Sequence, residues 1–124
     1  PPVEYRPEIG AVVTQLTRTA EAGCTGLMRM GDFTVYNAGY PGEFEVQIEA
    51  ANAPGRPVVW TSATTAKDGD TVEVFVDARG AAPGLYLIAI NLRAFGTERM
   101  SSRVVRGWLL VHHPGMPQCV QPGG

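Results

Sequence analysis

Residues 70–92 constrain the fold of this chain more than any other stretch. They consist of two apolar runs joined by a connection rich in glycine and proline. In the first run, Val72, Val74 and Val76 alternate with mostly polar residues, which is typical of a strand with one buried face. The second run, residues 85–92, is apolar at nearly every position, so we expect a central strand covered on both faces. The glycines and the proline between the runs favour a chain reversal, and the stretch is predicted to be a β-hairpin.

Short β-rich segments separated by turn residues recur along the rest of the chain. Residues 43–49 alternate apolar and polar positions most strictly, and residues 57–62 carry Trp60, the candidate for the centre of the core. Further strands are expected within residues 11–19, 27–37 and 100–113, while the pieces 17–22 and 63–67 are short candidates for helix. Gly107 inside the last strand indicates a bulge or a close approach of another backbone. Turn signals about every eight to twelve residues predict an antiparallel β-sandwich or barrel, and we favour the sandwich.

A family resemblance supports this fold class. The succession FTVYNAG, GEFEVQIE, VVW, GDTVEVFVDARGAAPGLYLIAINL and WLLV resembles bacterial immunoglobulin-like modules of the BACON, pilus-chaperone and fibronectin type III kind. The likeness covers residues 27–111, and it implies an all-β, immunoglobulin-like antiparallel sandwich of about seven to eight strands. It implies fold better than function, and no binding residue of these families carries over.

The ends of the chain are expected to differ from its middle. Residues 1–19 are predicted to form an extended N-terminal arm that could contribute a strand, and residues 114–124 a tail rich in proline and glycine. Residues 20–113 would then form the sandwich. At 124 residues, the chain fits this single domain.

Composition and cysteine usage bear on partners and compartment. The formal net charge of −2 gives no general attraction to nucleic acid. No apolar run approaches the roughly 20 residues that a membrane-spanning helix needs. The even cysteine count without a CxxC spacing favours a disulfide between Cys24 and Cys119, with two buried free thiols as the alternative. We therefore expect a secreted, periplasmic or cell-surface protein.

The residues offer little catalytic or metal chemistry. His112, His113, Met116 and Cys119 supply the ligand types of copper sites, but their order differs from that of cupredoxins, in which Cys precedes His and Met. A disulfide would also remove the thiolate. Neither a glycine-framed serine nor a base with an orienting acid can be assembled, so no enzymatic activity and no cofactor are expected.

Binding of other proteins is the predicted function. We expect a non-enzymatic structural or accessory subunit of an extracytoplasmic assembly that makes contact through its termini and a sheet face. The candidate contact residues are Tyr5, Arg93, Phe95, Arg103, Arg106 and Trp108. The arginines suit an acidic partner, unless they form a solvated face balanced by the glutamates of residues 43–49.

Two further expectations concern exposed apolar side chains. The alternative function is carbohydrate binding by an exposed aromatic platform, for which the candidates are Tyr36, Tyr40, Phe95 and Trp108. If the chain's own strands leave Leu85, Leu87 and Phe75 uncovered, a partner is expected on that side.

Overall fold

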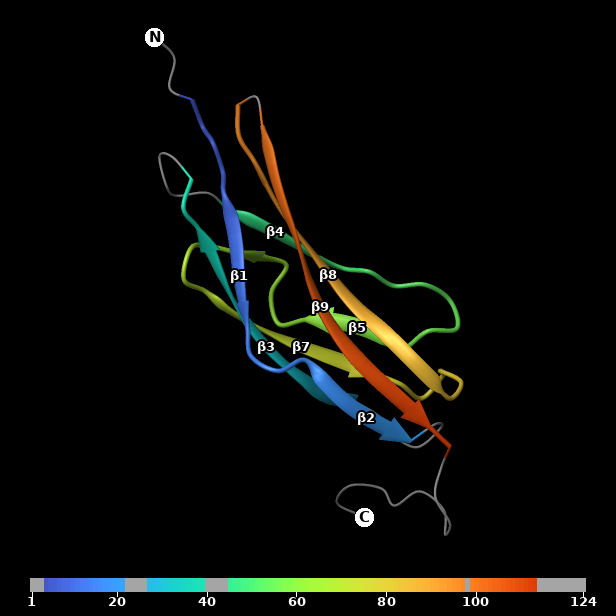
Figure 1. The fold of residues 1–124 in the computed structure, drawn as a ribbon. Coiled ribbons are helices and arrows are strands. Elements are labelled where there is room, and N and C mark those ends of the chain that lie inside the picture. Colours follow the sequence, from blue (N-terminus) through green and yellow to red (C-terminus); the bar gives the residue numbers. More distant parts are fainter. Residues whose placement is uncertain (1–3, 22–26, 40–44, 98, 114–124) are drawn as a thin grey trace.

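A computed structural model describes residues 4–21, 27–39, 45–97 and 99–113, in which nine strands form two sheets packed face to face (Figure 1). The strands are β1 (Ile9–Val13), β2 (Thr17–Glu21), β3 (Leu27–Asn37), β4 (Val46–Ala50), β5 (Val58–Thr61), β6 (Thr65–Ala66), β7 (Thr71–Asp77), β8 (Gly84–Phe95) and β9 (Met100–His112). The four-stranded sheet has the order β1-β3-β7-β5, and the five-stranded sheet has the order β2-β9-β8-β4-β6. Neighbouring strands are antiparallel except β2 and β9, which are parallel. The predicted all-β sandwich is therefore confirmed.

The core lies between the two sheets and is built by alternation along each strand. Its largest fully buried side chains are Phe33 and Val35 of β3, Val46 of β4, Val72, Val74 and Val76 of β7, Ile90 and Leu92 of β8, and Val105, Leu109 and Val111 of β9. The valines of β7 are the ones whose alternation predicted a strand with one buried face. Since successive side chains of a strand point to opposite sides, the intervening residues form the two outer faces.

The two strands predicted within residues 70–92 are present, but the prediction that they pair with each other as a hairpin is wrong. β7 pairs with β3 and β5, whereas β8 pairs with β9 and β4, so the two strands lie in different sheets. The connection rich in glycine and proline carries the chain from one sheet to the other. Alternation reveals which side of a strand is buried, but it does not reveal which strand is the neighbour.

The structure corrects three further predictions. The predicted helical pieces fall on strands β2 and β6. Trp60 does not occupy the centre of the core, because it lies on the outer face of the four-stranded sheet and stacks on Phe75 with 5.9 Å between ring centroids. Residues 85–92 are not covered on both faces, because Leu85 and Leu87 are exposed.

The N-terminal segment contributes one strand to each sheet. β1 pairs with β3 at the edge of one sheet, and β2 pairs with β9 at the edge of the other. The chain crosses between the sheets at Leu16, whose carbonyl oxygen accepts a 2.7 Å hydrogen bond from the backbone N–H of Trp108. A Cβ atom at Gly107 would lie 2.5 Å from that same oxygen, so the predicted close approach of backbone is confirmed.

The domain boundaries at residues 1–19, 20–113 and 114–124 stay a prediction, because the proposed tail lies outside the described residues. In the part of the chain that the structure describes, no helix has the length and hydrophobicity of a membrane span.

Candidate protein-binding face

Four large apolar side chains gather on the outer face of the five-stranded sheet. Leu85 lies opposite Leu110, and Leu87 lies opposite Trp108, in the antiparallel pair β8–β9. Their exposed fractions are 63% for Leu85, 46% for Trp108, 43% for Leu110 and 36% for Leu87. Opposed residues of a strand pair have Cβ atoms about 5 Å apart, so the four side chains form one contiguous block. We call this block the β8–β9 patch.

Local sequence explains why these side chains face outward. Ile88 and Leu109 alternate with them and point into the core. Gly107 lets β2 approach β9, which places Thr17 beside Trp108 and Thr19 beside Leu110. The patch therefore has a polar border along β2.

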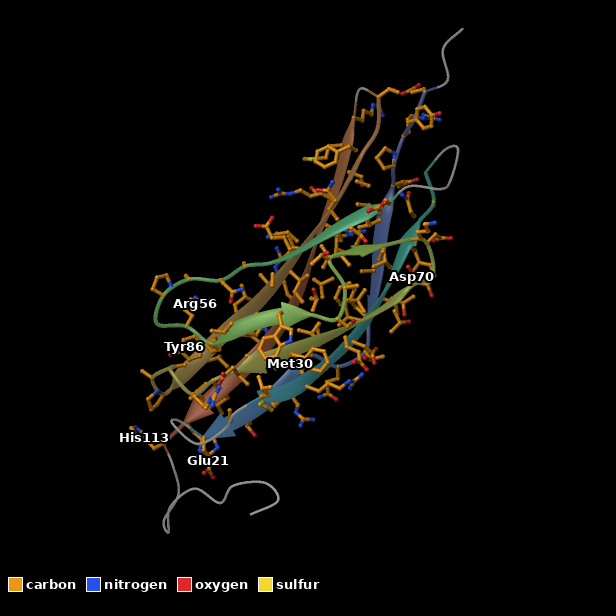
Figure 2. All side chains as sticks on the ribbon, turned by 180° about the vertical axis from the view of Figure 1, so that it is seen from behind. Glu21, Met30, Arg56, Asp70, Tyr86 and His113 are labelled. Atoms are coloured by element: carbon orange, nitrogen blue, oxygen red, sulfur yellow. The ribbon has the colours of Figure 1, made fainter. Side chains whose placement is uncertain are left out.

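Two arginines border the patch on other sides. Arg106 lies on the same face two residues from Trp108, and it forms no ion pair with another described residue. Arg56 donates a 2.7 Å hydrogen bond from Nη2 to the carbonyl oxygen of Leu87, and its guanidinium lies 5.6 Å from the ring centroid of Tyr86. Figure 2 shows Arg56 and Tyr86 side by side. Cationic groups thus accompany the apolar side chains.

The structure brings together four of the six predicted contact residues. Arg93, Phe95, Arg106 and Trp108 share the outer face of β8 and β9, although Phe95 lies at the far end of the strand pair, opposite Met100. Arg103 is exposed but alternates to the other side of β9. Tyr5 lies at the β8–β9 turn, where its backbone N–H donates to Oγ1 of Thr97 at 3.3 Å.

Leu110 completes the patch, although it is not among the candidate residues predicted from the sequence. The signal was available, because Leu110 stands two residues after Trp108 and therefore shares its face of the strand. The chain's own strands leave Leu85 and Leu87 uncovered, which is the arrangement for which the sequence predicts a partner on that side. Phe75 does not belong to this face, since it lies in the other sheet.

A second apolar patch lies on the opposite outer face of the sandwich. It consists of Leu27, Val58, Trp60 and Phe75, and we call it the Trp60 patch. A shallow hollow of about 340 Å³ is lined by Leu27, Met28 and Arg29 of β3 together with Trp60 and Phe75.

Carboxylates border the Trp60 patch. Arg29 contacts both Asp32, at 2.6 Å, and Glu73, at 3.5 Å, while Asp77 pairs with Arg79 at 2.7 Å. Three carboxylates thus share two guanidinium groups, and the border is acidic.

The residues considered as copper ligands do not form a site within the described part of the chain. His112 and His113 are both exposed at the end of β9, and adjacent strand residues point to opposite faces. Met116, Cys24 and Cys119 lie outside the described residues. Within the described ranges, no group of three or more His, Cys, Asp or Glu side chains could hold a metal ion.

Two of the three serine hydroxyls that the structure describes accept hydrogen bonds from backbone N–H groups. Oγ of Ser101 accepts from the N–H of Ile9, and Oγ of Ser62 accepts from the N–H of Glu73. Neither hydroxyl is hydrogen-bonded to a histidine among the described residues, so this part of the chain shows no nucleophile and base in contact.

The predicted aromatic platform for carbohydrate is not formed by the described aromatics. Tyr36 belongs to the outer face of the four-stranded sheet, whereas Phe95 and Trp108 belong to the five-stranded sheet. Phe95 and Trp108 also lie at different ends of their strand pair. Tyr40 is outside the described residues.

Comparisons with known proteins bear on the fold. No protein-family model and no curated protein matches the sequence. Among solved structures, the chain is similar to the ASH/PapD-like domain 7 of human CEP192, with a TM-score of 0.58 and 9% identity over 85% of this chain and 87% of that one.

Two further solved structures are similar. One is a family 123 glycoside hydrolase from Clostridium perfringens, with a TM-score of 0.57 and 11% identity over 88% of this chain but 28% of that one. The other is the YadV chaperone, with a TM-score of 0.48 and 13% identity over 86% of this chain and 53% of that one. Together with the two-sheet topology, the similarity to the PapD-like domain shows that this chain has the fold of an immunoglobulin-like β-sandwich.

Proposed function

We propose that this protein is a non-enzymatic structural or accessory subunit that binds another protein through the β8–β9 patch. The observation that carries the proposal is the contiguous exposed block of Leu85, Leu87, Trp108 and Leu110. Single exposed apolar residues are normal on a protein surface, whereas a contiguous block leaves apolar area in water that a partner could cover.

The composition of the block and its border supports a protein partner. Tryptophan and arginine are enriched at the centres of protein interfaces, because they combine a large apolar surface with a polar group. Trp108 and Arg106 are such a pair. The fold shared with a PapD-like domain is compatible with this function, since sandwiches present binding sites on sheet faces as well as on loops.

We also propose that the assembly is extracytoplasmic. The even number of cysteines supports this compartment if Cys24 and Cys119 are joined. The termini are proposed as additional contacts, of which Tyr5 at the β8–β9 turn is the described representative.

Site-specific photo-crosslinking in the source organism tests the proposal. A photoreactive residue at Leu85 is expected to give a discrete crosslinked product, whereas one at Lys67, which is exposed in the turn between β6 and β7 and lies outside both apolar patches, is the matched control. The partner identified in this way is then purified. Trp108→Ala is expected to weaken its binding at least tenfold, as for a central interface residue. Crosslinks that are equal at both positions, or binding that Trp108→Ala leaves unchanged, would overturn the proposal.

A further inference from the structure

The two apolar patches on opposite faces of the sandwich are complementary to each other. We propose that the β8–β9 patch of one molecule binds the Trp60 patch of a second copy of this chain, so that the copies associate head to tail. This inference rests on the proposed function and names the partner.

The two patches have a similar composition. Each consists of four large apolar side chains, and each contains a tryptophan. The Trp60 patch includes an open hollow of about 340 Å³, which is lined by the apolar side chains of Leu27, Met28, Trp60 and Phe75 and by the charged side chain of Arg29. The β8–β9 patch offers the exposed indole of Trp108, which is an apolar group of suitable size for such a hollow.

The charges around the patches distinguish this pairing from the alternatives. Arg56 and Arg106 border the β8–β9 patch, and neither is in an ion pair with a described residue. Arg93 of β8 lies on the same face, and so do two carboxylates, those of Glu49 on β4 and of Glu21, which lies opposite His112 at the end of the strands. Since three arginines stand against two carboxylates on and around this face, two β8–β9 patches facing each other would bring together two surfaces with an excess of positive charge, which opposes association.

Contact between unlike patches has the opposite effect. The border of the Trp60 patch carries Asp32 and Glu73, which share the single guanidinium of Arg29. In the head-to-tail pairing, Arg106 of one copy approaches these carboxylates of the next. Charge therefore favours unlike over like patches.

The position of the patches determines the kind of assembly. Because they lie on the outer faces of different sheets, a pair of molecules leaves one patch of each kind unused, and further copies can add. Four side chains on each partner are far fewer than the roughly 20–30 residues per side of a standard interface. Each contact is therefore weak, and the association depends on concentration.

Sedimentation velocity over a range of concentrations tests the inference with two blocking variants. Leu85→Glu blocks the β8–β9 patch, and Leu27→Glu blocks the Trp60 patch. Val12→Glu is the matched control, since Val12 is an exposed apolar residue of β1 outside both patches. Thermal unfolding verifies that each variant is folded, and Leu110→Glu and Val58→Glu replace any variant that is not.

The parent and Val12→Glu are expected to form species that grow beyond a dimer as concentration rises. Leu85→Glu and Leu27→Glu alone stay monomeric. An equal mixture of the two variants forms a dimer and nothing larger. The intact Trp60 patch of Leu85→Glu binds the intact β8–β9 patch of Leu27→Glu, and the two patches left over are both blocked.

Several results would overturn the inference. The inference fails if the parent protein stays monomeric, or if the mixture of the two blocking variants stays monomeric. It also fails if Leu27→Glu associates with itself or if Val12→Glu no longer associates. If the parent stays monomeric while Leu85 still crosslinks to a different protein, the head-to-tail inference fails and the proposed function survives. If Leu85 gives no specific crosslink at all, the proposed function itself fails.

Discussion

The carboxylate of Asp77 is held by a residue two positions later in the chain. Arg79 donates hydrogen bonds to it from the backbone N–H, from Nε and from Nη2, at 3.0, 3.0 and 2.7 Å. The side-chain hydrogen bonds and then the backbone hydrogen bond stabilise the ionised form, and they lower the pKa of Asp77 below its ordinary value of 3.8. The contact closes the turn at the end of β7.

Asp77→Asn tests the contribution of this contact to stability. A lowered pKa in the folded state means that the ionised carboxylate stabilises the fold above the unfolded pKa, and that this contribution is lost as the pH falls through the folded pKa. At neutral pH we expect the variant to lose at most about 1 kcal/mol, since Arg79 is exposed.

The measurement is urea unfolding of parent and variant at neutral pH and again at a pH below the lowered pKa of Asp77, where the difference should vanish. Glu49→Gln is the control, because no ion pair of Glu49 occurs within the described residues. A difference that persists in acid would show that Asp77 acts through packing instead of charge.

At the scale of the strand, β5 is the last strand of its sheet among the described residues, and a side chain covers its outer edge. Nδ2 of Asn52 donates to the carbonyl oxygen of Val59, and Oδ1 of Asn52 accepts from the N–H of Val59, both at 2.9 Å. The amide thus takes the place of a neighbouring strand. Edge strands without such cover can pair with other chains.

Asn52→Ala is expected to remove both hydrogen bonds and to leave two backbone groups of β5 without a protein partner. The expected loss is about 1–3 kcal/mol of unfolding free energy, with increased light scattering on warming. Gln47→Ala serves as the control, because Gln47 is an exposed polar residue of β4. If the variant has the unfolding free energy and the light scattering of the parent, water replaces the hydrogen bonds of the Asn52 amide with no loss of stability.

The approach of β2 to β9 depends on the missing side chain at Gly107. A Cβ atom there would lie 2.5 Å from the carbonyl oxygen and 2.6 Å from Cβ of Leu16. Gly107→Ala is therefore expected to push β2 away and to cost about 1–3 kcal/mol.

Urea unfolding of Gly107→Ala and of Gly80→Ala separates this steric effect from the general effect of replacing glycine. A Cβ atom at Gly80 would meet nothing within 4 Å, so its replacement should change stability by less than about 0.5 kcal/mol. Equal effects at the two positions would contradict the steric explanation.

The strands could be predicted from sequence where alternation decides the structure. Val72, Val74 and Val76 are buried as their spacing indicates, and Gly107 marks a close approach as its place in a strand indicates. The pairing of β7 and β8 could not be predicted, because the connection between them fits a sheet-to-sheet crossing as well as a hairpin. The sequence makes Trp60 a candidate for the centre of the core, whereas in the structure an aromatic pair with Phe75 shields part of the ring on an outer face.

The candidate site was predicted in part for the same reason. Trp108 and Arg106 were identified by residue type, while Leu110 required the period of the strand. Leu85 and Leu87 are exposed because the second sheet covers only one face of β8. A local sequence pattern does not reveal which face of a strand another sheet covers.

At the scale of the whole molecule, the parallel pairing of β2 and β9 brings two distant parts of the chain to one end. Glu21 and His112 are partners at the ends of these strands, and Figure 2 shows Glu21 and His113 at the same end of the sandwich. Cys24 follows three residues after Glu21, and Cys119 follows seven after His112. An extended chain spans up to about 3.3–3.6 Å per residue. Both segments are therefore long enough to bring the Cα atoms of Cys24 and Cys119 to the separation of about 5.5 Å that a disulfide requires.

The proposed disulfide between Cys24 and Cys119 would close a loop of most of the chain. Such a bridge restricts the unfolded state, and it is expected to contribute on the order of 4–5 kcal/mol, a large share of the stability of a small domain. Thiol titration of the denatured, unreduced protein should find no free thiol, and reduction should lower the unfolding free energy by about that amount. Cys24→Ser is expected to match the reduced parent and to show no response to reductant, because its single thiol has no partner within the molecule. Two titratable thiols in the unreduced parent, or a parent whose stability is insensitive to reductant, would contradict the bridge and would remove the main argument for an oxidising compartment.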